Sequence, residues 1–377
     1  MQDIAPNTLR RHLVAYPLAA AALAVMRAHG ASPGSVADAA TSASAGTGPP
    51  DGSPARQGWS MPSEHAPHTR CWMAWPARTE VWGEQLAAVR HDIMRLAQAI
   101  ARFEPVSMLV QPGQESEARK MCGSDIEIVP MPVDDMWLRD SGPIFLSDGK
   151  GKIAGSVFNF NGWGKKQIHS RDGAVAAALL AHLHLPAFHA PIVTEGGAVE
   201  TDGEGTLLVC EPSIDNQNRN PGVSRDQLTA YLRGWLGVDL VLWLPNSKPD
   251  YWTDGHIDGV ARFVQPGVVL VDQGLPEAVK FLRESSDARN RRLQVIEVPR
   301  PDEPHRGQPN FCDCYLNFYT PNGAVIMPSF GQIKSDHRAR NLIAAAFPDR
   351  QITPIRLDAI ASGGGLMHCV TQQEPAA

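Results

Sequence analysis

The feature that most constrains the fold is a recurring pattern of one helix with several short strands. Helix-like segments begin near Arg171, Ser224, Pro276 and Ser335, at intervals of about 53, 52 and 59 residues. A repeated interval of this length is typical of supersecondary units packed around an axis, although an ordinary α/β sheet with chance spacing is the alternative. Runs rich in β-branched and aromatic residues lie between the helices, at 156–160, 192–194, 206–209, 240–244, 260–264, 268–271, 295–298, 315–319, 324–327 and 352–355.

A long amphipathic helix is predicted over residues 79–103, after a short apolar strand at 71–76. Apolar residues recur there at spacings of three and four, which places them on one helix face. The predicted buried face contains Leu86, Val89, Ile93, Leu96 and Ile100.

Residues 1–58 differ from the rest of the chain. The pair Arg10-Arg11 precedes an apolar run at 14–26, and a stretch rich in small residues follows it, with Ala-Asp-Ala at 37–39. This order resembles an export signal of the twin-arginine kind, and the apolar run is too short to span a bilayer. We expect either an exported protein with a signal-like segment or a cytoplasmic protein with a disordered tail.

The remaining residues, 59–377, are expected to form one folded domain. The chain of 377 residues is 43% hydrophobic and 20% charged, which is ordinary for a globular protein. Its net charge of −6 and the lack of a basic run argue against nucleic acid as a partner. Six cysteines in so long a chain do not form a disulfide framework, and the spacing of Cys312 and Cys314 is a poor zinc signature.

Cys369 is the candidate nucleophile. It follows three glycines at 363–365, which allow the backbone to approach a ligand closely. A lone cysteine is more often a small buried apolar residue. However, the segment 253–258 supplies His256 and carboxylates, which a catalytic cysteine needs from elsewhere in the fold. At strand spacing, His256 and Asp258 would point to the same side.

Two further acidic residues lie where strands are expected to end. Asp140 precedes a Ser-Gly-Pro turn, and Glu195 follows the run 192–194 and precedes two glycines. Carboxylates bind a planar guanidinium through paired, charge-assisted hydrogen bonds, and a thiolate could attack its central carbon. A cationic substrate or a protonated His256 would raise the thiolate fraction of Cys369. The set therefore predicts a small cationic guanidine as the substrate.

Other sites are compatible with some of these residues. His256, Asp254, Asp258 and Cys369 could bind zinc, but there is no HExxH sequence and a lone histidine with carboxylates suits zinc poorly. A Ser-His-Asp site would lack the G-x-S-x-G turn. A non-catalytic binding protein is the alternative from outside the enzymes.

Taken together, the motifs resemble those of the agmatine deiminases and the bacterial peptidylarginine deiminases, within the guanidine-modifying (pentein) superfamily. This resemblance implies an α/β fold, a five-bladed propeller of ββαβ units with pseudo-fivefold symmetry. The matching segments keep the order of the family over about residues 59–374: 71–76, 137–143, 160–164, 195–197, 218–221, 253–258, 317–319 and 363–373.

The resemblance also implies a reaction and a role for each site residue. The reaction is hydrolysis of agmatine to N-carbamoylputrescine and ammonia, through a covalent amidino-thioether and without a metal or organic cofactor. Asp140 and Asp258 are expected to face each other across the guanidinium, with the nucleophile and the acid/base on opposite sides of its plane. The implied roles are nucleophile for Cys369, general acid/base for His256, guanidinium binding for Asp140 and Asp258, guanidinium binding and pairing with the histidine for Glu195, and aromatic wall for Trp137.

Two features depart from the agmatine deiminase pattern. Trp252 stands where those enzymes carry an acidic residue, and Lys165 and Lys166 stand where they often continue with glycine. Lysines near the pocket would suit a carboxylate-bearing substrate, so the alternative function is a peptidyl- or free-arginine deiminase that gives citrulline. The expected partner is the small cationic substrate, with no membrane span, and a homo-oligomer remains open.

Overall fold

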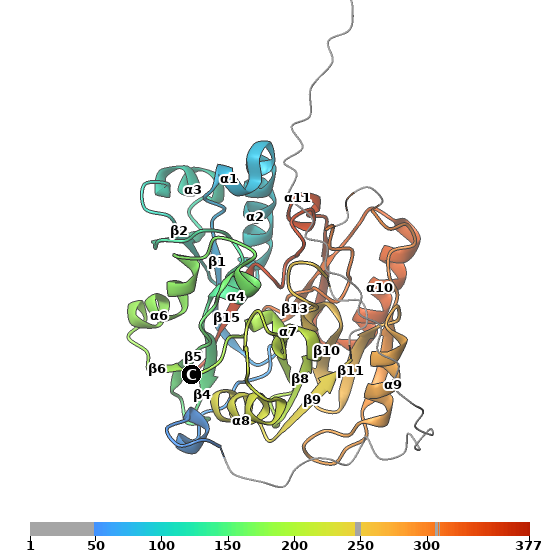
Figure 1. Ribbon diagram of the computed structural model, residues 1–377. Helices are drawn as coiled ribbons and strands as arrows, with labels where there is room; N and C mark the ends of the chain where they lie inside the picture. Colours follow the sequence, from blue (N-terminus) through green and yellow to red (C-terminus); the bar gives the residue numbers. More distant parts are fainter. Residues whose placement is uncertain (1–48, 246–249, 306–307, 309) are drawn as a thin grey trace, which may run out of the picture. The chain divides into compact units, whose positions relative to one another are not determined.

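A computed structural model describes residues 49–245, 250–305, 308 and 310–377 (Figure 1). Most of the expected signal-like segment, residues 1–48, lies outside the described residues. Residues 49–58 were grouped with that segment, but they include a 3-10 turn, η1 (Pro54–Gln57), that packs against helix α8 (Arg225–Leu236). In the described part of the chain, no helix combines the length and apolar character that a bilayer span requires.

Fifteen strands are found among the described residues, and they form five separate sheets. The strands are β1 (His68–Ala74), β2 (Val106–Val110), β3 (Ile126–Pro130), β4 (Ile144–Ser147), β5 (Ile153–Val157), β6 (Ala187–His189), β7 (Val199–Thr201), β8 (Thr206–Cys210), β9 (Leu240–Leu244), β10 (Ala261–Gln265), β11 (Val268–Asp272), β12 (Gln294–Val298), β13 (Ala324–Pro328), β14 (Gln351–Ile355) and β15 (Thr371–Pro375). Their orders are β15-β1-β2-β3, β4-β5-β6, β7-β8-β9, β10-β11-β12 and β13-β14.

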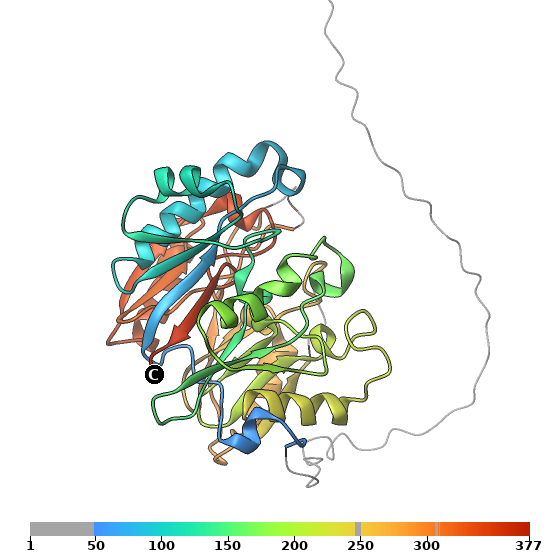
Figure 2. The same cartoon turned by 90° about the vertical axis from the view of Figure 1, so that its left-hand side faces the viewer.

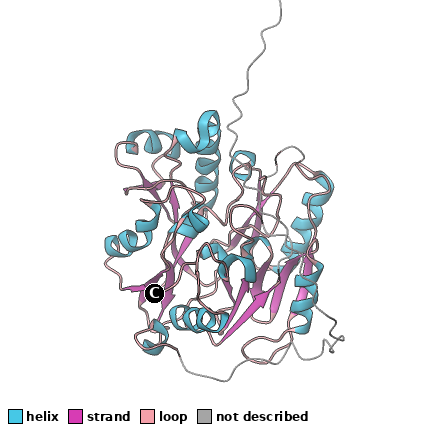
Figure 3. Cartoon of the chain, viewed as in Figure 1, coloured by secondary structure: helices cyan, strands magenta, loops and turns pink. Residues whose placement is uncertain are grey.

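Helices connect the parallel strands, as Figure 3 shows by colour. The longer ones are α2 (Leu86–Ile100), α3 (Glu115–Cys122), α6 (Asp172–His182), α8, α9 (Pro276–Glu284) and α10 (Ile333–Ala346). The shorter ones are α1 (Thr79–Trp82), α4 (Leu138–Ser141), α5 (Gly162–Lys165), α7 (Glu211–Ile214) and α11 (Asp358–Ala361), with 3-10 turns η2 (Gly83–Gln85), η3 (Gly196–Ala198) and η4 (Ile257–Gly259).

The five sheets share one connectivity. In each of them a helix joins two neighbouring parallel strands: α2 joins β1 to β2, α6 joins β5 to β6, α8 joins β8 to β9, α9 joins β11 to β12, and α10 joins β13 to β14. In four of the sheets an antiparallel strand pairs with the first strand of this unit: β4, β7 and β10 come before their units in the sequence, whereas β15 comes from the C-terminal end of the chain. The helices predicted near residues 171, 224, 276 and 335 are therefore confirmed as the repeated element of a mixed α/β fold.

Strands from opposite ends of the described sequence meet in the first sheet. Strand β15 runs antiparallel to β1, with Cys71 opposite Gln373 and Met73 opposite Thr371. Figure 2 shows this pairing as a red strand beside a blue one. Because Cys369 lies two residues before β15, the pairing fixes the segment that carries the candidate nucleophile.

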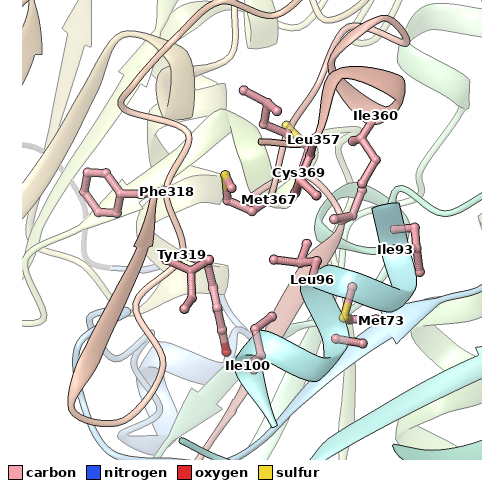
Figure 4. Packing of buried hydrophobic residues seen from close by; sticks show 14 of the residues in the cluster. Met73, Ile93, Leu96, Ile100, Phe318, Tyr319, Leu357, Ile360, Met367 and Cys369 are labelled. Atoms are coloured by element: carbon pink, nitrogen blue, oxygen red, sulfur yellow. The ribbon is translucent and has the colours of Figure 1, made fainter. Parts of the chain in front are cut away.

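The largest apolar cluster lies under helix α2. Ile93, Leu96 and Ile100 are fully buried on one face of the helix, as their spacing predicted. Figure 4 shows them in the same cluster as Met367 and Cys369. Burial of each aliphatic side chain contributes roughly 1.5–3 kcal/mol, so this cluster supports the loop before β15 from below.

One long helix over residues 79–103 was predicted, and the structure divides it into α1, η2 and α2. The division falls at Gly83, whose φ of 54° and ψ of −130° are incompatible with a helix. The apolar periodicity that carried the prediction begins only at Leu86, so it holds for α2 alone.

Two predicted strands are absent because side chains take the backbone hydrogen bonds of a strand. At 192–194, Asn220 accepts a hydrogen bond from the backbone N–H of Val193 and donates one to its carbonyl. At 315–319, the guanidinium of Arg262 donates to the carbonyls of Leu316 and Phe318. The third strand of the second sheet is instead β6, and 315–319 makes only an isolated bridge between residues 319 and 326.

Leu96→Ala is expected to lower the free energy of unfolding by about 2–5 kcal/mol, because it leaves a cavity in the main cluster. Gln98→Ala, on the exposed face of the same helix, should change it by less than about 0.5 kcal/mol. Urea denaturation of both variants is the measurement. Equal effects would mean that α2 does not pack against the core as described.

Candidate active site

The Cys369 thiol faces an amide and a carboxylate. Its Sγ accepts a hydrogen bond from Asn317 Nδ2 at 3.2 Å and lies 3.5 Å from Asp258 Oδ2. The loop around it is fixed by Arg139, whose backbone N–H donates to the carbonyl of Cys369 and whose Nε donates to that of His368. Cys369 is 8% exposed, so its sulfur is reached only through the pocket described below.

His256 lies between two carboxylates. Its Nε2 is 3.3 Å from Glu195 Oε2, and its Nδ1 is 3.8 Å from Asp140 Oδ1 and makes no hydrogen bond with any described residue. Arg219 Nε donates to both oxygens of Glu195, at 2.8 and 3.0 Å. The arginine therefore fixes the glutamate, the glutamate orients the imidazole, and Nδ1 is left for another partner.

Asp140 is held by donors on both oxygens. The backbone N–H of Gly197 donates to Oδ1 and the indole N–H of Trp163 donates to Oδ2, each at 2.9 Å. A side chain at Gly197 would be excluded, since its Cβ would lie 2.6 Å from His256 Nδ1, 2.8 Å from Asp140 Oδ1 and 3.1 Å from Asp258 Oδ2. This close approach also shows that the histidine and the two aspartates converge on one point.

Asp258 contacts a buried network of ionisable side chains. His368 Nδ1 lies 2.8 Å from Asp258 Oδ2, and His368 Nε2 lies 2.7 Å from Glu64 Oε2. The same glutamate oxygen accepts from Arg262 at 2.8 Å. His368 thus joins the candidate site to an ion pair inside the fold.

The two aspartates have opposite pKa shifts. Burial raises the pKa of Asp140, and the charges of Asp258 and Glu195 add to the rise, which outweighs the opposing effect of His256. Burial also acts to raise the pKa of Asp258, but the hydrogen bond and charge of His368 outweigh it and lower that pKa to about 2. Asp258 is therefore the more firmly ionised of the pair.

The pKa values of His256 and Cys369 are both raised. Burial lowers the pKa of His256, but Asp140 and Glu195 outweigh it and raise that pKa to about 9. Burial, together with Asp258 and Asp140, raises the pKa of the Cys369 thiol well above its usual value. Without ligand at neutral pH, the site thus holds an imidazolium and a neutral thiol, and a bound cation would favour the thiolate.

A pocket of about 510 Å³ leads to Cys369 and Asp140. No lysine, arginine or histidine is among the described residues that line it, whereas Glu84, Asp135 and Asp140 are. Its aromatic wall is larger than predicted and consists of Trp82, Trp137, Trp163 and Trp252.

The glycine triplet makes room for this aromatic wall. A Cβ on Gly363 would lie 2.3 Å from the ring of Trp82, one on Gly364 would lie 2.9 Å from that of Trp252, and one on Gly365 would lie 2.5 Å from that of Trp137. The Cβ on Gly365 would also lie 3.0 Å from Cys369 Sγ. The three glycines therefore let indole rings rest directly against the loop of the nucleophile.

The structure brings together all six residues selected from the sequence, although not on the predicted elements. Asp140 lies in helix α4 and not at a strand end. Glu195 precedes the turn η3, and Asp258 lies in η4 directly after His256. The prediction that strand alternation places His256 and Asp258 on one side was wrong; a 3-10 turn does so.

Lys166 is not available to a ligand carboxylate. Its Nζ donates to the backbone carbonyls of Tyr251 and Trp252 and to Asp254 Oδ1, the last at 2.8 Å. Asp254 is bound by Arg219 as well, so it belongs to this outer cluster rather than to the group around Cys369. No set of three or more His, Cys, Asp or Glu side chains suited to a metal ion occurs in the described ranges.

Sequence reasoning assigned no role to three residues that contact the site: Asn317, His368 and Arg219. Each lies inside a segment that carried the family resemblance: 317–319, 363–373 or 218–221. That position is the signal that could have identified them. Their partners are distant in sequence, and spacing alone does not reveal such contacts.

Comparisons with known proteins agree with this site. The family model described as Porphyromonas-type peptidyl-arginine deiminase matches residues 60–375. A protein of Legionella pneumophila is 39% identical over 335 residues, 85% of this chain and 96% of its own length. Agmatine deiminase of Pseudomonas aeruginosa is 35% identical over 362 residues, 87% of this chain and 98% of its own length.

A solved structure of agmatine deiminase from Enterococcus faecalis superposes with a TM-score of 0.82 at 30% identity, covering 86% of this chain and 98% of that one. The fold and site are thus those of a guanidine-modifying α/β protein. The chain belongs to the Porphyromonas-type peptidyl-arginine deiminase family.

Asp140→Asn and Asp258→Asn are expected to have opposite effects on stability at pH 7. Removing the charge of Asp140, whose pKa is raised, should leave the free energy of unfolding unchanged or increase it. Asp258, with a pKa of about 2, contributes stability that is complete above pH ~4 and lost as the pH falls through 2. Its replacement should cost on the order of 2 kcal/mol. Urea denaturation at pH 7 is the measurement, with Asp148→Asn as the control. An equal loss of stability in both variants would contradict the assignment.

His256 should titrate with a pKa of about 9, and Asp140→Asn should move that pKa toward 6.5 because it removes a neighbouring charge. The contribution of His256 to stability is then complete below pH ~6.5 and is lost as the pH rises through 9. NMR titration of selectively labelled histidines measures both values. A wild-type pKa of 6.5 or lower would show that the carboxylates do not act on this imidazole as described.

Proposed function

We propose that the protein hydrolyses the guanidine of agmatine to give N-carbamoylputrescine and ammonia. The observation that carries the proposal is the convergence of Cys369, His256 and three buried carboxylates at the pocket of about 510 Å³. Among the residues that the structure describes, those lining the pocket include carboxylates and indoles but no cationic side chain. Two relatives, at 35% and 30% identity, match this chain over nearly their whole length and are named agmatine deiminases. Their names support this substrate.

The first half of the proposed reaction forms a covalent intermediate. Asp140 and Asp258 accept hydrogen bonds from the guanidinium and place its carbon near Cys369 Sγ. The positive charge of the substrate promotes loss of the thiol proton to solvent, and the thiolate attacks the carbon. His256, protonated at neutral pH, gives a proton to one nitrogen, which leaves as ammonia and leaves an amidino-thioether on Cys369.

The second half consumes water. His256, now neutral, accepts a proton from a water molecule, and the resulting hydroxide attacks the same carbon. Collapse of that adduct breaks the carbon–sulfur bond and releases Cys369 as thiolate. The hydroxyl proton of the adduct is given up, which leaves the neutral ureido product and restores the thiol. Glu195, fixed by Arg219, orients the imidazole in both halves. No step requires a metal or an organic cofactor.

A peptidyl- or free-arginine deiminase is the second candidate. It was favoured by Lys165 and Lys166, which could have met a substrate carboxylate. Because Lys166 is bound to Asp254 and two carbonyls, and neither lysine lines the pocket, agmatine is the better substrate for this site.

The unit shared by the five sheets suggests how the sheets are arranged. We infer that the five sheets are the blades of a propeller with pseudo-fivefold symmetry, since each contains the same β-α-β unit and in four an antiparallel strand pairs with the first strand of that unit. In the fifth sheet, the isolated bridge between Tyr319 and Ile326 stands where that strand would be. We also propose that residues 59–377 are the catalytic domain, with the turn η1 packed on it, and that the residues before 49 are a signal-like or tail segment.

Ammonia release from agmatine, arginine and a blocked arginine peptide, each with and without a chelator, tests the proposed function. Agmatine should be the best substrate, and the chelator should have no effect. Inactivity on all three would favour a binding protein, and loss of activity with chelator would favour a metal site.

Cys369→Ser should reduce kcat by several orders of magnitude, because the hydroxyl is a weaker nucleophile without a strong base beside it. Its melting temperature should stay near that of the wild type. Mass spectrometry of wild-type protein quenched during turnover should find the amidino adduct on Cys369. An adduct on another cysteine would disprove the assignment, and Cys312→Ser is the matched control.

A further inference from the structure

The pocket contains a second buried carboxylate that the proposed reaction does not use. Asp135 lines the pocket and is 1% exposed. Its oxygens accept hydrogen bonds from neutral donors, Trp82 Nε1 at 2.8 Å and Gln167 Nε2 at 3.3 Å. A carboxylate in such a position is costly to bury unless a positive charge reaches it.

Several other buried carboxylates near the pocket have a cationic partner, and Asp135 does not. Asp134 pairs with Arg78 at 2.9 Å, Glu195 with Arg219 at 2.8 Å, and Glu64 with Arg262 at 2.8 Å. Within the described residues, Asp135 makes no ion pair with an arginine, lysine or histidine. Burial accordingly raises the pKa of Asp135, despite its hydrogen bonds.

Asp135 and Asp140 are arranged in the same way at the pocket wall. Each accepts a hydrogen bond from an indole N–H, Asp135 from Trp82 and Asp140 from Trp163. The ring of Trp137 lies between these two indoles, with centroids 6.1 Å from Trp82 and 6.5 Å from Trp163. The pocket wall therefore carries two carboxylates, Asp135 and Asp140, with the ring of Trp137 between the indoles that bind them.

We propose that Asp135 binds a second cationic group, the primary ammonium at the far end of an alkylguanidine whose guanidinium lies at Asp140. The methylene chain lies along the ring of Trp137 and excludes water there. The ammonium forms a charge-assisted hydrogen bond with Asp135 and meets the faces of the surrounding indoles. This inference rests on the proposed deimination and adds its substrate class: dicationic guanidines with an unsubstituted terminal amine.

The same arrangement discriminates against arginine. The α-carboxylate of arginine would place a negative charge beside Asp135, and within the described part of the chain the lining offers no lysine, arginine or histidine to bind it. A blocked arginine peptide lacks the free ammonium as well. Specificity then arises from repulsion of one end group as well as from attraction of the other.

Asp135→Asn tests the proposal with a matched pair of substrates, agmatine and butylguanidine. The two differ only in the terminal amine. The variant should lose about 10- to 100-fold in kcat/KM for agmatine, mainly through KM, because a buried charge-assisted bond is removed. Its kcat/KM for butylguanidine should change by less than about threefold. Equal losses on both substrates would overturn the proposal.

A second variant and a binding measurement separate the remaining outcomes. Glu84→Gln removes the exposed carboxylate of the lining, and a selective loss on agmatine in this variant but not in Asp135→Asn would assign the ammonium to Glu84 instead. In a Cys369→Ser background, calorimetry should show that Asp135→Asn weakens binding of agmatine and not of butylguanidine. Wild-type inactivity on both substrates would instead overturn the deimination itself.

Folding of the variant is checked by its melting temperature. Asparagine keeps the shape of Asp135 and its bond from Trp82, and it removes a buried charge without an ionic partner. The melting temperature of Asp135→Asn should therefore be equal to or above that of the wild type. A large decrease would show that the charge serves the fold rather than a ligand.

Discussion

The site depends on pairing buried negative charge with positive charge placed behind it. Carboxylates that converge in a dry pocket repel one another, and each ion costs several kcal/mol to remove from water. Arg219 compensates Glu195, Arg262 compensates Glu64, and His368 bridges Glu64 to Asp258. Because none of these three side chains lines the pocket, the carboxylates keep their remaining acceptor capacity for a ligand.

Segments far apart in the sequence must meet for this pairing to exist. His368 connects Asp258 to Glu64, residues separated by 110 and 304 positions from it. The repeated β-α-β connectivity allows such meetings, since several of its units are followed by the segments that carry the site residues, among them α4, η3 and η4. A site made of loop residues can then be as rigid as the sheets that support the loops.

The sequence was a good guide to the repeated helix and to the candidate site residues. It was a poorer guide to the local backbone structure around those residues. The spacing of the helices survives in α6, α8, α9 and α10, because amphipathic segments bury one face wherever they lie. Residues 192–194 and 315–319 look like strands, but Asn220 and Arg262 occupy their backbone groups, and a propensity argument cannot see such distant partners. The family resemblance supplied the roles, whereas the charges behind the site became visible only in three dimensions.

The contact between the glycine triplet and the indole wall has a consequence for redesign. The indole wall sets the width of the pocket, and it packs directly against the loop that carries Cys369. Gly365 lies against both Trp137 and Cys369. A smaller side chain in the wall would leave a void into which the loop could relax, and a larger one would displace it. Substrate range in this protein is therefore coupled to reactivity, and new specificities would require paired substitutions in the wall and in the loop.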